Sequence, residues 1–373
     1  MPGVGYGVPV DDGRARSPSA PPDHPAFSAF GIRHRGISEY YPTVTETPAP
    51  FRWGILGVAR INRALVGPLA SNGHQLLAIA SRSAERARTY AETQGIARAY
   101  GSYEELLADP DLDAVYIPLP HSMHVEWAEK AAQAGKHVLV EKPISLAGAG
   151  VRTLQSAARA HGVVITEAFM YRHHPLVARV RELAHDGTIG QLQGVRGTFS
   201  FVLDRAFDTR LVPEFGGGSL WDVGCYPVSF ARTIVGRRPL SVQAVANWAA
   251  GQIDLTFFGQ MQFPDNVVAQ VHSSFESPFK TEMEIIGSEG RLLIRHPFKP
   301  EPTETIEVMK AHETYTVTVE GPSLYQGEVD DVRDAARAGR EPLVTLEDSL
   351  DNVDTLTSLL QAARSGTTVD LDA

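Results

Sequence analysis

The sequence predicts an α/β protein: an N-terminal Rossmann domain with a doubly wound parallel sheet, followed by an α+β domain with a large, mostly antiparallel open sheet. Three observations predict it. From residue 51 to about residue 140, short apolar runs alternate with longer amphipathic stretches, as in strand–helix–strand units. A glycine turn follows the first apolar run. After Tyr171 the runs follow one another without long intervening helices, which is typical of antiparallel sheets.

The first part of the pattern predicts a βα alternation. Expected strands are 51–56, 75–79, 99–100, 114–117 and 137–140, and expected helices are 61–71, 84–94, 102–108 and 123–133. Right-handed crossovers between parallel strands place helices on both faces of such a sheet. The cofactor-binding domain is therefore expected to span residues 51–170.

The second part predicts a β-rich domain over residues 171–373 for substrate binding and oligomerisation. Expected strands are 194–202, 241–248, 252–262, 266–275, 281–286 and 290–294. Two amphipathic stretches, 325–338 and 346–364, predict helices, the second ending near Gly366 as a C-cap. These helices could also pack back on the Rossmann domain.

Residues 1–50 carry many Gly, Pro, Ser and charged residues without periodicity, which predicts a flexible arm. A mis-assigned start codon and an ordered arm that wraps a neighbouring subunit stay open as alternatives.

Composition narrows the class of partner. The chain has 373 residues and a formal net charge of -10, which argues against a general affinity for nucleic acid. The single cysteine, Cys225, cannot form an internal disulfide, and this favours a reducing compartment. No run approaches the roughly 18 apolar residues of a membrane span, and no secretory signal is evident. We expect a cytoplasmic protein with a small-molecule partner and no membrane or nucleic-acid partner.

The turn after the first strand is a degenerate form of the dinucleotide fingerprint G-x-G-x-x-G. Gly57 occupies the first position, while Ala59 and Asn62 replace the second and third glycines. Gly57 allows the tight turn, and the small Ala59 lets a pyrophosphate approach the backbone at Arg60 and Ile61. Without other support, an ordinary strand-to-helix turn explains the segment equally well.

The end of the second expected strand indicates which dinucleotide binds. NAD-binding proteins usually have an acidic residue there, which accepts hydrogen bonds from the ribose hydroxyls. This chain has Ser81, Arg82 and Ser83 instead. Arg82 can pair with a 2′-phosphate, and serine hydroxyls can donate to it. The segment therefore predicts NADP, with NAD as the alternative.

Two further segments carry a resemblance to a known family. PLPHSMH follows Ile117, and AGKHVLVEKP spans residues 134–143. This ordered set resembles the family of glucose-fructose oxidoreductase, inositol dehydrogenase and rhizopine catabolism proteins (Gfo/Idh/MocA), from about Arg52 to the C-terminus. The resemblance implies that Lys142 lies beside the nicotinamide and the substrate oxygen, often after a cis peptide to Pro143. It also implies a cofactor pocket formed by Pro120, His121, His124, Glu141 and Lys142.

A second cluster, GGGSLWDVGCYPV, spans residues 216–228. Asp222 and Tyr226 are four residues apart, so on a helix their side chains face the same way. Many relatives have His at the position of Tyr226, so the chain is similar to the Tyr subgroup, which includes glucose-fructose oxidoreductase, NADP-dependent xylose dehydrogenase and dimeric dihydrodiol dehydrogenase. The resemblance implies three catalytic residues: Tyr226 transfers a proton with a pKa lowered by Lys142, and Asp222 orients a substrate hydroxyl. A helix-terminal carboxylate and a packed core aromatic are the structural alternatives for Asp222 and Tyr226.

The segment EAFMYRHHP, residues 167–175, resembles the linker strand that places an aromatic residue and an arginine near the substrate. Tyr171 and Arg172 are therefore candidates for substrate binding. The adjacent His173 and His174 point apart on an extended segment, so no metal site is expected.

Together these features predict an NADP-dependent oxidoreductase that transfers hydride between nicotinamide and a carbinol or carbonyl carbon of a sugar or sugar derivative. A trans-dihydrodiol dehydrogenase and a non-catalytic dinucleotide-binding regulator stay open as alternatives. We further expect a homodimer or homotetramer that forms through the C-terminal sheet.

Overall fold

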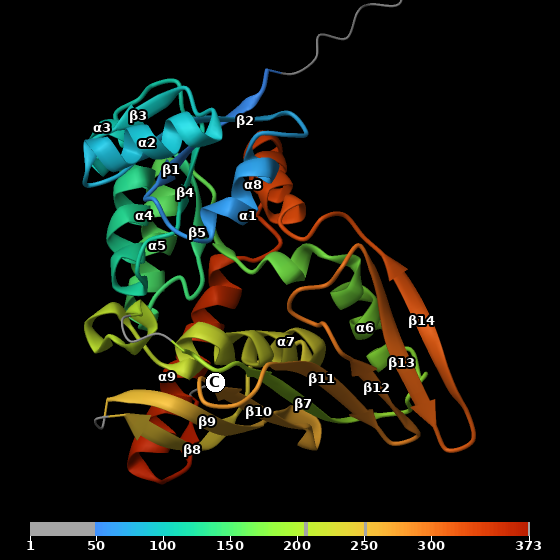
Figure 1. Ribbon diagram of the computed structural model, residues 1–373. Coiled ribbons are helices and arrows are strands. Elements are labelled where there is room, and N and C mark those ends of the chain that lie inside the picture. The colour runs from blue at the N-terminus through green and yellow to red at the C-terminus, as the bar shows by residue number, and fades with distance from the viewer. Residues whose placement is uncertain (1–48, 205–207, 250–251, 372–373) are drawn as a thin grey trace, which may run out of the picture. The chain divides into compact units, whose positions relative to one another are not determined.

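The structure is a computed structural model that describes residues 49–204, 208–249 and 252–371. Both sheets lie in one compact unit (Figure 1). The expected arm over residues 1–50 falls almost entirely outside the described residues. No helix among the described residues is long and apolar enough to cross a membrane.

Sheet A is a parallel sheet of six strands in the order β3-β2-β1-β4-β5-β6, the order of a Rossmann fold. Its strands are β1 (Phe51–Leu56), β2 (His74–Ala80), β3 (Arg98–Tyr100), β4 (Ala114–Ile117), β5 (His137–Glu141) and β6 (Ile165–Ala168). Between them run the helices α1 (Asn62–Leu69), α2 (Ala84–Gln94), α3 (Tyr103–Leu107), α4 (His124–Gln133) and α5 (Gly148–His161). The predicted fold class is confirmed.

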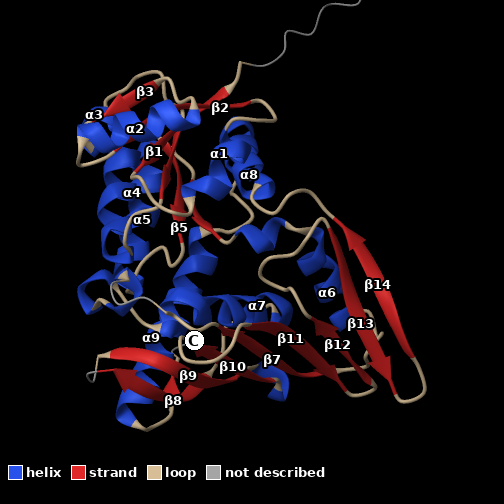
Figure 2. Cartoon of the chain, in the orientation of Figure 1, coloured by secondary structure: helices blue, strands red, loops and turns tan. Residues whose placement is uncertain are grey.

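Neighbouring residues of each strand in sheet A face opposite helical layers. In β4, Tyr116 belongs to a core with residues of α1, whereas Ile117 belongs to the core formed with α4 and α5. Alternation of side chains along a strand produces this division. Helix α8 (Gln326–Ala338), from the far end of the chain, covers the same face as α1 and contributes Val329 and Val332 to its core. A C-terminal helix thus does pack back on sheet A (Figure 2).

Sheet B has nine strands in the order β14-β13-β12-β11-β7-β10-β9-β8-β15, antiparallel except for the pair β7 and β10. Its strands are β7 (Leu192–Ser200), β8 (Ser241–Ala249), β9 (Ile253–Gln262), β10 (Val268–Ser274), β11 (Lys280–Gly287), β12 (Gly290–Ile294), β13 (Thr303–Lys310), β14 (Thr314–Glu320) and β15 (Val369–Asp370). Helices α7 (Cys225–Val235) and α9 (Leu346–Ser365) pack against it, and α6 (Pro175–His185) contacts β14. The predicted large, mostly antiparallel sheet is confirmed.

Several elements are not among those that the sequence pattern predicts: β6, α5, α6, and the hairpin of β13 and β14. The first turn of α5 contains two glycines and has no side-chain cap, so the usual start signal is missing. In β13, by contrast, buried Glu304, Ile306 and Val308 alternate with more exposed neighbours. That period of two was a readable strand signal.

Candidate active site

The carboxyl ends of β1, β2, β4 and β5 meet at one edge of sheet A, where ligands bind in such folds. Gly57, which follows β1, has a φ of 122°, and a Cβ there would lie 2.9 Å from the Leu119 side chain. The position therefore requires glycine. Buried Asn62 donates a hydrogen bond to the Gly57 carbonyl at 2.8 Å, so the residue that replaces the third glycine closes the turn.

The turn leaves the start of α1 open to an anion. Helix α1 has no side-chain cap and no acidic residue in its first turn, so an anion can meet its terminal N–H groups. Ala59 and Ile61 are partly exposed and Arg60 is exposed. These features fit the pyrophosphate of a dinucleotide.

The end of β2 has no carboxylate to repel a 2′-phosphate. Ser81 is buried and its hydroxyl accepts a hydrogen bond from the backbone N–H of Ser83 at 3.3 Å, while Arg82 is exposed. Arg86, which lies outside the predicted motifs, donates to the Val58 carbonyl at 2.9 Å and adds a second cation here. The residues present fit NADP.

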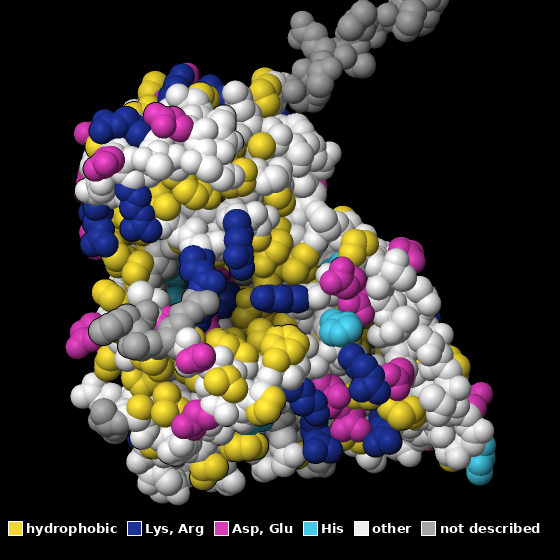
Figure 3. Space-filling model, in the orientation of Figure 1, with side chains coloured by type: hydrophobic (Ala, Val, Ile, Leu, Met, Phe, Trp, Pro, Cys, Tyr) yellow, Lys and Arg dark blue, Asp and Glu magenta, His cyan; other side chains and the backbone are white. Residues whose placement is uncertain are grey.

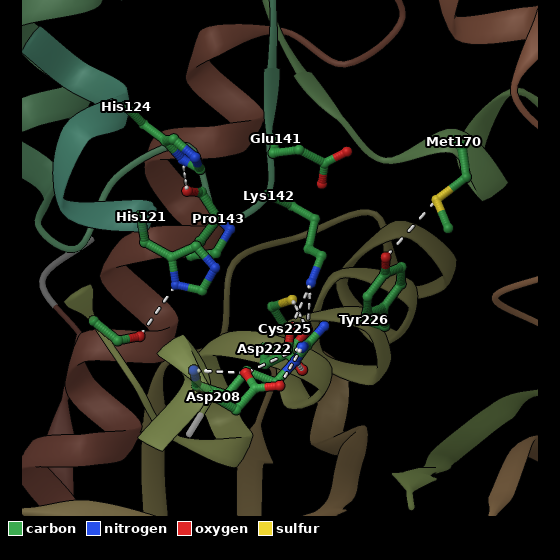
Figure 4. A network of polar contacts seen from close by, with 12 residues as sticks. His121, His124, Glu141, Lys142, Pro143, Met170, Asp208, Asp222, Cys225 and Tyr226 are labelled. Carbon is green, nitrogen blue, oxygen red and sulfur yellow. Dashed lines mark hydrogen bonds and ion pairs between the residues drawn. The ribbon is translucent and has the colours of Figure 1, made fainter. Parts of the chain in front are cut away.

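Lys142 follows the last residue of β5, and its peptide bond to Pro143 is cis, as the resemblance implied. Its ammonium nitrogen lies 2.6 Å from the backbone oxygen of Asp222 and 3.1 Å from Oδ1 of the same residue. The same nitrogen is 5.1 Å from the ring centre of Tyr226. The three residues predicted to be catalytic therefore lie together (Figure 4).

Asp222 is held as a carboxylate. It lies between Lys142 and Arg210, whose Nε is 2.5 Å from Oδ2. Burial alone would raise the pKa of Asp222, but the charges of Lys142 and Arg210 outweigh burial and hold that pKa well below its usual range. Asp222 is thus a hydrogen-bond acceptor at neutral pH and no source of protons.

Tyr226 keeps its proton. It is 5% exposed, and burial, together with nearby acidic groups such as Glu141, raises its pKa well above the ordinary value. The expected lowering of this pKa by Lys142 is wrong, because the ammonium group lies over the face of the ring and bonds to Asp222. Among the described residues, the hydroxyl donates its only hydrogen bond to the Met170 sulfur, at 3.8 Å (Figure 4).

Asp222 belongs to a π-helical turn, Leu220–Gly224, that leads into α7. Buried Asp254 fixes the start of this turn: its Oδ2 accepts from the Ser219 hydroxyl at 2.8 Å and from the Leu220 N–H at 2.7 Å. A Cβ at Gly218 would collide with Asp254. The glycine run therefore lets Asp254 approach and position the turn that carries Asp222.

Comparison with known proteins decides the family. The model of the oxidoreductase family with an NAD-binding Rossmann fold matches residues 51–169, and that of the GFO/IDH/MocA C-terminal domain matches residues 177–293. The chain belongs to the Gfo/Idh/MocA oxidoreductase family. Family membership agrees with the resemblance found in the sequence.

Relatives within the family act on sugars and on diols. The D-xylose 1-dehydrogenase (NADP(+)) 2 of Haloferax volcanii is 36% identical over 324 residues, which cover 86% of this chain and 99% of that protein. The trans-1,2-dihydrobenzene-1,2-diol dehydrogenase of Xenopus laevis is 32% identical, covering 80% of this chain and 93% of its own.

A solved 3-ketoreductase from Actinomadura kijaniata, in complex with NADP and TDP-benzene, superposes with a TM-score of 0.80 at 29% identity, covering 84% of this chain and 98% of its own. Two of its solved variants replace a lysine with alanine and a tyrosine with phenylalanine. Those two residues are as far apart in that sequence as Lys142 and Tyr226 are in this one.

The two histidines expected in the cofactor pocket differ in position. His121, which follows the partly exposed Pro120, has Nδ1 3.1 Å from the Gly216 oxygen, and burial with nearby positive charge lowers its pKa to about 3. His124 is fully buried, with its two ring nitrogens 2.8 Å from the oxygens of Pro143 and Leu119. These two contacts hold the backbone at Pro143, the residue after Lys142, in place. The His124 side chain is not exposed to a ligand.

The surroundings of the Glu141 carboxyl group shift its pKa. It accepts a hydrogen bond from the Tyr116 hydroxyl at 2.7 Å, and burial raises its pKa. Cys225 is fully buried, and burial raises the pKa of its thiol, so it is no nucleophile.

Tyr171 lies beside Tyr226, with ring centres 5.9 Å apart, but the polar groups of Tyr171 and Arg172 are engaged elsewhere. Tyr171 is fully buried and its hydroxyl donates to Ser229 at 2.9 Å, while Arg172 pairs with Asp348 at 2.8 Å. Both side chains are used in internal contacts. Within the described ranges, no group of three or more His, Cys, Asp or Glu side chains is placed to hold a metal ion.

Proposed function

We propose that the protein is an NADP-dependent oxidoreductase that interconverts a carbinol and a carbonyl on a sugar or sugar derivative. The observation that carries this proposal is the convergence of Lys142, Asp222 and Tyr226 at the edge of sheet A where the glycine turn also lies. When bound, NADP would supply or accept the hydride. The residues that would hold it are Gly57, Ala59, Arg60 and Ile61 at the pyrophosphate, Ser81 and Arg82 at the 2′-phosphate, and Pro120, His121 and Glu141 nearer Lys142.

Each of the three central residues has one task that its environment favours. Tyr226 holds its proton and can donate it to a substrate oxygen as negative charge develops there. Lys142 stabilises that charge. Asp222 stays ionised and accepts a hydrogen bond from a neighbouring substrate hydroxyl. The matching lysine–tyrosine spacing in the 3-ketoreductase supports these assignments.

A substrate panel tests the proposal. We expect NADPH absorbance to change with at least one aldose, inositol, ketosugar or nucleotide-linked sugar. The dihydrodiol dehydrogenase relative favours a second candidate, so the panel includes a trans-dihydrodiol. Turnover of the diol alone would favour that candidate, and dinucleotide binding without any turnover would favour a regulator.

The preference for NADP is expected to depend on Arg82. Replacing Arg82 with alanine removes a charged hydrogen bond to the 2′-phosphate, and kcat/KM for NADPH should fall by about 10- to 100-fold. The value for NADH should change little, since NADH has no phosphate there. Arg88→Ala, at an exposed arginine of α2, is the matched control, and an equal loss in both variants would contradict the assignment.

Sheet B supports the proposal of a homodimer or homotetramer. Helices α7 and α9 pack against the sheet, while Val245, Phe258 and Phe279 remain 67%, 54% and 70% exposed. Light scattering should give a multiple of the 40.5 kDa chain, and Phe258→Glu should lower it because a charge would be buried. Leu343→Glu, at a similarly exposed leucine elsewhere, is the control. A monomeric parent protein would refute the proposed assembly.

The cytoplasmic location also stays a prediction.

A further inference from the structure

A buried carboxyl group beside the segment that carries Lys142 has no task in the proposed reaction. Glu167 lies in β6, opposite Val140 of β5, and its side chain is fully buried. Figure 3 shows Lys and Arg side chains gathered in a hollow of the surface, where a ligand can reach them. Glu167 has no such access to a substrate. Any effect it has on the reaction must therefore pass through another residue.

The first oxygen of this carboxyl group contacts the chain just after Lys142. Oε1 of Glu167 accepts a hydrogen bond from the Ile144 backbone N–H at 3.0 Å. The carbonyl oxygen of the same peptide group, that of Pro143, lies 2.8 Å from Nδ1 of His124. The peptide group next to Lys142 is thus held at both of its polar ends.

The second oxygen connects the carboxyl group to the C-terminal helix. Oε2 of Glu167 accepts a hydrogen bond from the Ser349 hydroxyl at 2.7 Å, and Ser349 is a buried residue near the start of α9. A buried polar group that loses its partner costs free energy, so these two contacts fix the orientation of the carboxyl group. Glu167 therefore links α9 to the segment that carries Lys142.

We propose that Glu167 is a positioning residue: it holds the peptide group between Pro143 and Ile144, and thereby places the Lys142 ammonium group at the substrate oxygen. This inference rests on the proposed function and adds a residue to it. The effect on the reaction can be large, because a displacement of about 1 Å in an active site can cost about 100-fold in rate.

The ionisation of Glu167 gives the proposal a pH signature. Burial raises its pKa to about 7; the charge of Asp348 also raises it, while that of Arg172, which pairs with Asp348, lowers it. The nearby Cys225 thiol stays neutral, because burial raises its pKa. Above pH 7 the carboxylate makes a charge-assisted hydrogen bond with the Ile144 N–H, which is stronger than the bond that the neutral acid makes below pH 7.

Two substitutions separate the hydrogen bonds of Glu167 from its charge. Glu167→Gln keeps an oxygen for the Ile144 N–H and offers an amide N–H to the Ser349 hydroxyl, but it cannot ionise. Glu167→Leu removes both contacts, and its kcat with the best substrate of the panel should be about 10- to 100-fold lower. In the parent protein, kcat should fall by about 5-fold as the pH drops through about 7. The Gln variant should show no such inflection.

Two further variants make the test specific. The Ser349 hydroxyl favours the charged form of Glu167, so Ser349→Ala should move the inflection of kcat to higher pH. Thr166→Val is the matched control, since the buried Thr166 hydroxyl donates to the Val344 oxygen at 2.8 Å, in the segment that leads into α9. This control should lose stability and keep the parent kcat and pH profile. Equal losses of kcat in Glu167→Leu and Thr166→Val, or an inflection that persists in Glu167→Gln, would overturn the proposal.

NMR separates this proposal from the proposed function, because it needs no turnover. In protein with isotope-labelled isoleucine and lysine, the Ile144 amide and the Lys142 side-chain nitrogen should shift together with a midpoint near pH 7, and neither should shift in Glu167→Gln. If both signals shift as expected but no sugar is turned over, the oxidoreductase proposal fails and the action of Glu167 on Lys142 stands. If a sugar is turned over while the Lys142 signal is the same in the parent protein and in Glu167→Gln at every pH, the positioning role fails and the oxidoreductase proposal stands.

Discussion

Replacing Tyr226 with phenylalanine should lower kcat by about 100- to 10,000-fold, the usual contribution of a positioned proton donor. The substitution removes only the hydroxyl, which donates to the Met170 sulfur at 3.8 Å and has no other hydrogen-bond partner in the part of the chain that the structure describes. The aromatic packing around the ring stays intact. Stability and NADP affinity should therefore change little, and kinetics with the best substrate of the panel would measure the loss.

Tyr171→Phe is the matched control for this experiment. Tyr171 lies near Tyr226, with ring centres 5.9 Å apart, but its hydroxyl donates to buried Ser229. Its removal should cost about 1 kcal/mol of folding stability and leave kcat nearly unchanged. Equal effects of the two substitutions on kcat would show that Tyr226 is only a packed aromatic residue.

Replacing Lys142 with methionine should lower kcat by about 100- to 1000-fold, because a preorganised positive charge at the reacting oxygen is lost. The substitution also leaves Asp222 with Arg210 alone. The pKa of Asp222, now held low by both cations, should rise. A new loss of kcat/KM should therefore appear on the acid side, as protonation removes the hydrogen-bond acceptor that Asp222 offers the substrate.

Two comparisons make the Lys142 experiment specific. Lys142→Arg should not restore full activity, since a planar guanidinium cannot reproduce the short contacts of the ammonium with Asp222. Lys130→Met, at a lysine of α4 paired with Glu126 on the surface, should leave kcat unchanged. A Lys142→Met enzyme with the parent pH profile and kcat would contradict the role assigned to the lysine.

The catalytic trio could be anticipated from sequence because its members lie in local motifs. Lys142 directly follows a strand in the EKP segment, and Asp222 and Tyr226 share a short helical segment. Arg210 and Asp254 could not be anticipated, since they reach the cluster through tertiary contacts and no sequence spacing reveals them. The raised pKa of Tyr226 could not be anticipated for the same reason: a motif does not show how deeply a ring is buried or to which atom a neighbouring ammonium points.

The secondary structure, like the catalytic residues, could be predicted from sequence where the signal is local. Sheet A could be predicted because β1, β2, β4 and β5 each contain a short apolar run and are separated by helices. Tyr171 and Arg172 were assigned to the substrate on resemblance alone, yet Arg172 pairs with Asp348, which lies far along the chain in α9. Such long-range partners depend on how the elements pack, and only the folded structure reveals them.

Transfer of deuterium from NADPH to the substrate tests the central claim most directly. The cofactor would carry deuterium at both hydrogen positions on C4 of the nicotinamide, and the product of a carbonyl sugar would be analysed by mass spectrometry and NMR. We expect the label on the new carbinol carbon of the product, in the parent protein and, more slowly, in Tyr226→Phe. A reduced product without the label, or no product from any sugar or diol despite bound NADPH, would contradict the claim.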